Sequence, residues 1–186
     1  MATFKKNKPT EAYFTLAGDV NGAMVERVFR AVSLMTEQGI TTAHVLLQSH
    51  GGYVSDGICL FNFLSNLPIK IVTYNSGVVA SIAVIVFLSG HRRYASETAR
   101  FMLHKSHAST YKGASPSQLK IISDGLIADD IRTESITRQY LKLKLSQWKV
   151  HALDDLHLTA QEALAAKLIH RIGNFNPLPN ARIISI

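Results

Sequence analysis

Three kinds of side chain in this 186-residue sequence could together activate a hydroxyl group for attack on a carbonyl carbon. Ser81 opens an apolar segment, and we expect it at a helix start, where free N–H groups stabilise developing negative charge. His104 ends an apolar strand, a position suited to a general base. Asp154 or Asp155, just before a capped helix, could orient the imidazole. Taken singly, each has a plainer interpretation: a small packing residue, an edge histidine and a solvated acidic pair.

Gly51 and Gly52 form a second candidate feature, a turn that follows an apolar strand. Without side chains, backbone N–H groups can approach a reacting carbonyl oxygen closely. Two such donors are often the largest catalytic term, and the loss of one costs ~3–4 kcal/mol. A lone Gly-Gly pair also occurs in ordinary turns, so the pair is weak evidence alone.

The elements that must position these residues follow from apolar spacing. The pattern predicts strands at 13–16, 43–48, 69–74, 93–94 and 101–104, and helices at 21–36, 54–67, 80–87, 115–146 and 159–168. Alternating strands and helices indicate an α/β domain with a mostly parallel sheet, in which ligands lie where strands end and helices begin. We expect one domain over 1–186, with a short N-terminal segment at 1–12.

The helix predicted over 115–146 is unusually long. Ser115 and Gln118 have the spacing of a capping box, with Pro116 in the first turn. At ~1.5 Å per residue the helix would be ~45 Å long, more than a compact domain needs. We expect it to project and to pack against another subunit.

Composition limits the class of protein. A hydrophobic content of 47% excludes a disordered chain. Because Cys59 is the single cysteine, an intrachain disulfide is excluded, and we expect this thiol to be buried. The first residues lack the apolar run of a secretory signal, so we expect a cytoplasmic protein. The uncharged stretch 71–90 is broken by polar residues at 73–77, which argues against a membrane span.

The net charge of +7 comes from scattered basic residues, which favours a solvated surface over a nucleic-acid site. His104 and His107 lack a third ligand at plausible spacing, so no metal site is expected.

Four motifs in order resemble the Clp peptidase family. Ser49-His-Gly-Gly-Tyr53 stands where that family has Ser-Pro-Gly-Gly-Ser, and Gly77-Val-Val-Ala-Ser81-Ile82 stands for Gly-Gln-Ala-Ala-Ser-Met. Met102-Leu-His104-Lys-Ser106 is similar to Met-Ile-His-Gln-Pro, and Asp155-Leu-His-Leu-Thr-Ala-Gln-Glu-Ala163 is similar to the acidic segment of the family. The likeness extends over roughly 13–172, most of the chain.

The resemblance implies a ββα-spiral fold shared with crotonases, and a serine endopeptidase that cleaves unfolded proteins or peptides without a cofactor. It implies a triad of Ser81, His104 and Asp155, with Asp154 as the fallback acid. The oxyanion would be bound by backbone N–H groups of Gly52 and Ile82, with Gly51 shaping the turn. The long helix would be the family's handle, which implies a homo-oligomer, a heptameric ring or double ring.

Two departures from the family pattern bear on these expectations. His50 replaces the family's proline before the glycine pair, which is expected to loosen that loop. The family normally has a longer N-terminal segment that contacts an ATPase unfoldase, so the short segment here weakens the case for an AAA+ ATPase partner.

Three alternatives remain open. A Ser–Lys peptidase of the kind that cleaves signal peptides would use Lys105 as the base. A crotonase-type acyl-CoA enzyme would use the same oxyanion hole without the Ser81 hydroxyl. A non-catalytic ring scaffold would fit the altered glycine motif.

Overall fold

A six-stranded sheet forms the centre of the molecule, which is a computed structural model that describes residues 10–110 and 112–186. The strand order is β8-β5-β3-β2-β1-β9, and every pairing in this sheet is parallel. Its strands are β1 (Glu11–Ala17), β2 (Thr42–Gln48), β3 (Lys70–Asn75), β5 (Arg92–Ala95), β8 (Arg171–Ile172) and β9 (Ile183–Ser185). The predicted α/β class with a mostly parallel sheet is confirmed. The predicted N-terminal segment 1–12 lies, up to residue 9, outside the described residues.

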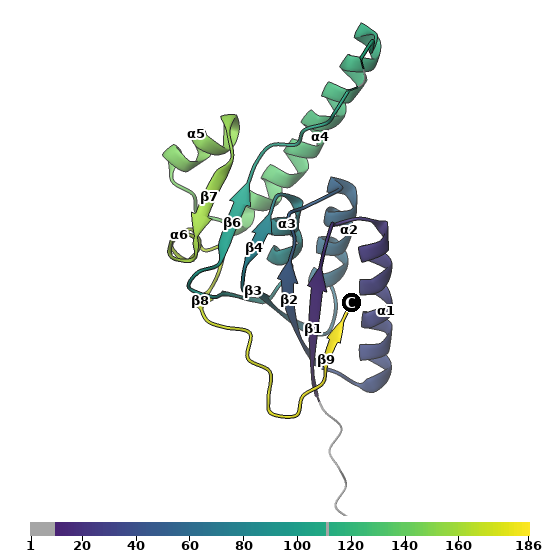
Figure 1. Cartoon of the computed structure of the whole chain (residues 1–186), viewed down its shortest axis with the longest axis vertical. Helices are drawn as coiled ribbons and strands as arrows, with labels where there is room; N and C mark the ends of the chain where they lie inside the picture. Colours follow the sequence, from purple (N-terminus) through teal and green to yellow (C-terminus); the bar gives the residue numbers. More distant parts are fainter. Residues whose placement is uncertain (1–9, 111) are drawn as a thin grey trace, which may run out of the picture.

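Helices α1 (Gly22–Gln38) and α2 (Val54–Ser65) lie beside each other against this sheet (Figure 1). The Asn21 side chain caps α1 by accepting a hydrogen bond from the Met24 N–H, and Gly39 ends the helix in the left-handed conformation. The buried residues of both helices recur at helical spacing, so each helix has one apolar side that packs into the core. Cys59, expected to be buried, is exposed on α2.

A second sheet of three strands carries most of the candidate site. It has the order β4-β6-β7, with β4 (Val78–Ala80) parallel to β6 (Arg100–Leu103) and β7 (Leu156–Thr159) antiparallel to β6. The sequence prediction missed β4 and β7, which have three and four residues. The next element, α3 (Ile82–Leu88), follows β4 and packs mainly against α2, and all of its residues are buried.

The long helix is shorter than predicted. α4 (Pro116–Tyr140) begins with the expected capping box of Ser115 and Gln118, and its tip extends beyond the body of the molecule (Figure 1). The expectation of one helix over 115–146 is wrong at its C-terminal end, because Leu141 is extended and only 4% exposed. The Lys142 N–H then donates to the Ala166 carbonyl at 2.8 Å, so tertiary contacts end the helix.

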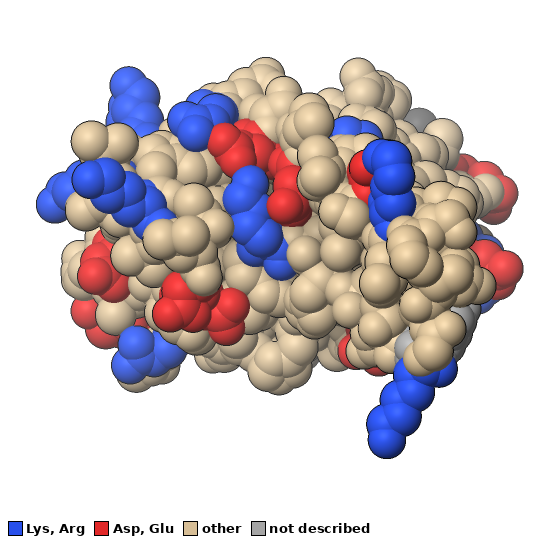
Figure 2. All heavy atoms as spheres, turned by 90° about the horizontal axis from the view of Figure 1, so that it is seen from above, with Lys and Arg blue, Asp and Glu red and all other residues tan. Residues whose placement is uncertain are grey.

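A separate helix, α5 (Leu145–Leu153), follows and leads into β7. α6 (Ala160–Ala165) starts with a capping box of Thr159 and Glu162. Within residues 10–110 and 112–186, none of the helices combines the length and apolar character needed to cross a membrane. On the face shown in Figure 2, basic and acidic side chains are interspersed among uncharged ones, so neither sign of charge dominates this face.

Candidate active site

Ser81 occupies a sharp turn between β4 and α3. Its backbone has φ 56° and ψ −135°, a conformation that non-glycine residues rarely adopt and that clusters at functional sites. The Ser81 N–H donates to the Met102 carbonyl of β6 at 2.8 Å, and this bond holds the turn against the neighbouring strand. The Ser81 hydroxyl makes no cap bond to α3, so it is available to other partners.

His104 follows β6 and reaches the Ser81 hydroxyl. The Nε2 atom of His104 lies 2.7 Å from the Oγ of Ser81. The strand register explains the meeting, since Ala80 pairs with Met102 and the carboxyl ends of parallel strands share one edge. With Nε2 unprotonated, the imidazole accepts the hydroxyl proton, which is the geometry that a general base requires.

Asp155, not Asp154, lies against the imidazole. The Oδ1 atom of Asp155 is 3.4 Å from the Nδ1 of His104, and the Asp155 side chain is 47% exposed. Leu103 pairs with Leu156 in the antiparallel β6–β7 ladder, so the residue before Leu156 lies beside the residue after Leu103. Asp154 instead caps α5, and its Oδ1 accepts the Asp155 N–H at 2.8 Å.

The glycine turn approaches Ser81 from β2. Gly51 and Gly52 have φ values of 115° and 153°, which favour glycine. The Gly51 N–H donates a hydrogen bond to the Ser49 hydroxyl at 3.1 Å. Gly52 forms a parallel bridge with Val20: the Val20 N–H donates to the Gly51 carbonyl, and the Tyr53 N–H donates to the Val20 carbonyl. In such a bridge the N–H of Gly52 itself is directed away from Val20.

Ile82 is the first residue of α3, and the N–H groups at that position have no partner within their own helix. Its N–H and that of Gly52 both belong to residues that line the same pocket as Ser81 and His104. Gly52 and Ile82, the residues whose main-chain N–H groups are the predicted oxyanion donors, therefore line one pocket together with Ser81. His50 is exposed beside the glycine turn. The turn itself is held by the hydrogen bond from the Gly51 N–H to the Ser49 hydroxyl.

The pocket in front of Ser81 has a volume of about 230 Å³. Its wall includes residues from α4 and also His151 of α5, which is 6% exposed. Burial lowers the pKa of His151, and the positive charge of Lys105 lowers it further. Sequence reasoning missed His151, because no helix was predicted over 147–153 and nothing in the local pattern marks an inward histidine.

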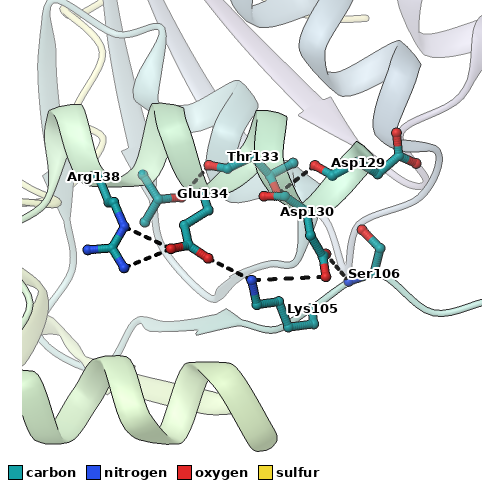
Figure 3. Close-up of polar contacts among 8 residues, drawn as sticks. Lys105, Ser106, Asp129, Asp130, Thr133, Glu134 and Arg138 are labelled. Atoms are coloured by element: carbon teal, nitrogen blue, oxygen red, sulfur yellow. Dashed lines mark hydrogen bonds and ion pairs between the residues drawn. The ribbon is translucent and has the colours of Figure 1, made fainter. Parts of the chain in front are cut away.

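The Lys105 side chain is directed toward α4, as Figure 3 shows. Its Nζ lies 2.6 Å from an oxygen of Glu134 and 4.0 Å from Asp130. The next residue, Ser106, donates its N–H to the Oδ1 of Asp130 at 2.7 Å. Sequence reasoning missed these acids, although Asp130, Glu134 and Arg138 have the i, i+4 spacing of one helix face.

Within the described part of the chain, the His, Cys, Asp and Glu side chains form no group of three or more that could hold a metal ion. The groups that the fold brings together here are the Ser81 hydroxyl, the His104 imidazole and the Asp155 carboxylate.

Comparison with known proteins places this architecture among peptidases. The sequence model described as Clp protease matches residues 7–175. The chain is 29% identical over 148 residues to the "ATP-dependent Clp protease proteolytic subunit" of Oryza sativa subsp. indica and to that of Triticum aestivum, covering 77% of this chain and 67% of each relative. A mutant of ClpP1 from Listeria monocytogenes has the same fold, with a TM-score of 0.75, 17% identity, and coverage of 89% of this chain and 92% of that one.

Proposed function

Because this chain belongs to the Clp protease family, we propose that it is a serine endopeptidase that hydrolyses peptide bonds of unfolded proteins or peptides in a homo-oligomeric chamber. The observation that carries the serine mechanism is the 2.7 Å contact between the Ser81 Oγ and the His104 Nε2. The strained turn at Ser81 supports it, since such turns present a nucleophile away from the backbone.

The reaction begins when the Ser81 hydroxyl attacks the peptide carbonyl carbon while His104 takes its proton. Asp155 holds the imidazole in the required tautomer and stabilises its cation. The carbonyl oxygen becomes an oxyanion, which the N–H groups of Gly52 and Ile82 stabilise. His104 then gives its proton to the leaving amine, and water hydrolyses the acyl-enzyme by the same steps in reverse order.

His104 is the base in this mechanism rather than Lys105. The His104 imidazole contacts the Ser81 hydroxyl, whereas the Lys105 ammonium is hydrogen-bonded to Glu134 at 2.6 Å. A Ser–Lys mechanism would require Lys105 to leave that carboxylate.

The homo-oligomer is supported by the surface of α4. This helix projects from the body and has only one buried residue, Thr137, yet it exposes several large apolar side chains (Figure 1). Those more than 40% exposed are Leu119, Ile121, Ile127 and Ile131. Several exposed large apolar side chains on one projecting helix support a protein interface there, and a second copy is the partner that a ring requires. Light scattering on the purified protein tests this part of the proposal, and a monomeric mass contradicts it.

The serine mechanism is tested with a fluorophosphonate probe and a fluorogenic peptide. We expect the probe to modify Ser81, and we expect Ser81→Ala to lose peptide turnover by orders of magnitude, ~10⁶-fold in a comparable triad. Ser33→Ala, which removes an exposed hydroxyl on α1, is the control. Peptide turnover that survives in Ser81→Ala would contradict the mechanism.

A further inference from the structure

The two residues after His104 are both tied to α4. The Lys105 ammonium donates to Glu134 at 2.6 Å, and the Ser106 N–H donates to Asp130 at 2.7 Å (Figure 3). Asp130 and Glu134 are four residues apart on α4, so their carboxylates project from one side of the helix. The segment that follows His104 is therefore held to α4 at two consecutive residues.

The carboxylate of Glu134 also holds α5. Its second oxygen accepts a hydrogen bond from the Arg138 Nε at 2.8 Å. The Arg138 guanidinium stacks on the ring of Trp148, with 4.0 Å between its Cζ and the ring centroid. Trp148 belongs to α5, which ends two residues before Asp155. Glu134 thus lies between the segment that carries His104 and the helix that leads to Asp155.

Glu134 is suited to join two cations. Hydrogen bonds from Lys105 and Arg138 lower the pKa of its carboxyl, against the opposing effect of burial. The side chain is 27% exposed, and each of its two oxygens has a cationic donor. Charge-assisted hydrogen bonds of this type are stronger than neutral ones and fix geometry.

The pair that this linkage would position needs external support. The contact between the His104 Nδ1 and the Asp155 Oδ1 is long, at 3.4 Å, and the Asp155 side chain is 47% exposed. A displacement of ~1 Å in such a constellation can lower turnover by ~10²-fold.

We propose that Glu134 is a positioning residue for the peptidase reaction: it links the His104 segment through Lys105 to α5 through Arg138, and so holds the imidazole against Asp155. This role rests on the proposed function, because it presupposes the triad. Glu134 itself does not touch the reacting atoms.

The test compares Glu134→Gln with Glu26→Gln in the full chain. Glutamine keeps the shape of the side chain, but its NH2 group replaces one of the two oxygens, so either Lys105 or Arg138 loses its acceptor. Glu26 forms an equivalent i, i+4 pair with Arg30 on α1, and both side chains are exposed. We expect kcat for a fluorogenic peptide to fall at least about tenfold in Glu134→Gln with KM unchanged, and no change in Glu26→Gln. An unaltered kcat in Glu134→Gln would overturn the proposal.

A double-mutant cycle separates positioning from a general structural effect. If Glu134 acts by placing Asp155 against His104, then Glu134→Gln should alter turnover of an activated ester by less than about twofold in an Asp155→Asn background. An equal fold-reduction in both backgrounds would overturn the proposal. Arg138→Met, at a largely exposed side chain, gives the same cycle if Glu134→Gln does not fold.

Failure of the proposed function itself has a different signature. In that case the unaltered protein neither hydrolyses the peptide nor forms a Ser81 adduct, and the positioning role falls with it. Turnover that depends on Ser81 but not on Glu134 overturns the positioning role alone.

Discussion

The backbone of Gly51 lies directly against the side chain of Ser81. A β-carbon at position 51 would be 2.6 Å from the Cβ of Ser81 and 3.1 Å from its Oγ. Gly51→Ala must therefore move either the glycine turn or the hydroxyl. We expect fluorophosphonate labelling of Ser81 to slow at least about tenfold, since small displacements at such a site are costly.

Gly18→Ala separates this contact from backbone strain. Gly18 has φ 105°, close to the 115° of Gly51, but a β-carbon there would meet nothing within 4 Å. Both substitutions should lower the free energy of unfolding by about 1 kcal/mol or more, because alanine disfavours positive φ. Only Gly51→Ala should slow labelling, and equal labelling rates in the two variants would contradict the role assigned to the contact.

A second pair of glycines tests how α2 supports Ile82. Gly57 packs so closely on α3 that a β-carbon would lie 2.2 Å from the Cγ1 of Ile82, whose N–H is a proposed oxyanion donor. We expect Gly57→Ala to lower both thermal stability and peptide turnover. Gly125 lies in α4 with nothing within 4 Å, so Gly125→Ala should raise the free energy of unfolding by about 1 kcal/mol through helix propensity. Thermal unfolding of the two variants measures the difference, and a stabilised Gly57→Ala would contradict the packing argument.

The parts of the site that local pattern could predict are those set by short apolar strands. The position of His104 at the end of a strand follows from the sequence, and so does that of Ser81 at a helix start, whereas the strand before Ser81, β4, was not predicted. The choice between Asp154 and Asp155 could not be made locally, because it depends on the register of β6 against β7.

The end of α4 shows where local pattern is insufficient. The segment Leu141-Lys-Leu-Lys-Leu145 consists of good helix formers, yet it interrupts the helix because Leu141 enters the core and Lys142 bonds to Ala166. The links of Glu134 to Lys105 and Arg138 combine a spacing visible in the sequence with a partner that only the fold brings near.

Arg93 is expected to contribute strongly to stability. Its side chain is 6% exposed and donates to the carbonyls of Gly90, Lys167 and Leu168. Burial lowers the pKa of the guanidinium to about 10, which shows the cost of desolvating this cation. We expect Arg93→Lys to lose about 2–3 kcal/mol of unfolding free energy, because one ammonium cannot reproduce the planar fork of donors. Arg92→Lys, at the exposed neighbour, should be neutral in urea unfolding, and equal effects of the two variants would contradict the assignment.

Stability should decline as the pH falls below about 6.5, because the fold lowers the pKa of three histidines. Desolvation is the main cause that lowers the pKa of His44, His151 and His170 from 6.5. Just below pH 6.5 the unfolded chain therefore binds more protons than the folded one, so unfolding becomes more favourable, while the full stability is present above that pH. Glu134, whose carboxyl pKa is lowered from 4.5, adds its own loss only at more acidic pH.

His170 offers a specific check of this pH dependence. Its Nδ1 accepts the Arg93 N–H at 3.0 Å, and a protonated imidazole cannot accept that bond. We expect urea unfolding to give a lower free energy at about pH 5.5 than at about pH 7.5, with a smaller difference in His170→Asn, whose carbonyl oxygen can accept without titrating. His157→Asn, at an exposed histidine of β7, should keep the full difference. A pH dependence that is the same in the unaltered protein and in His170→Asn would show that the Arg93 bond does not depend on the neutral imidazole.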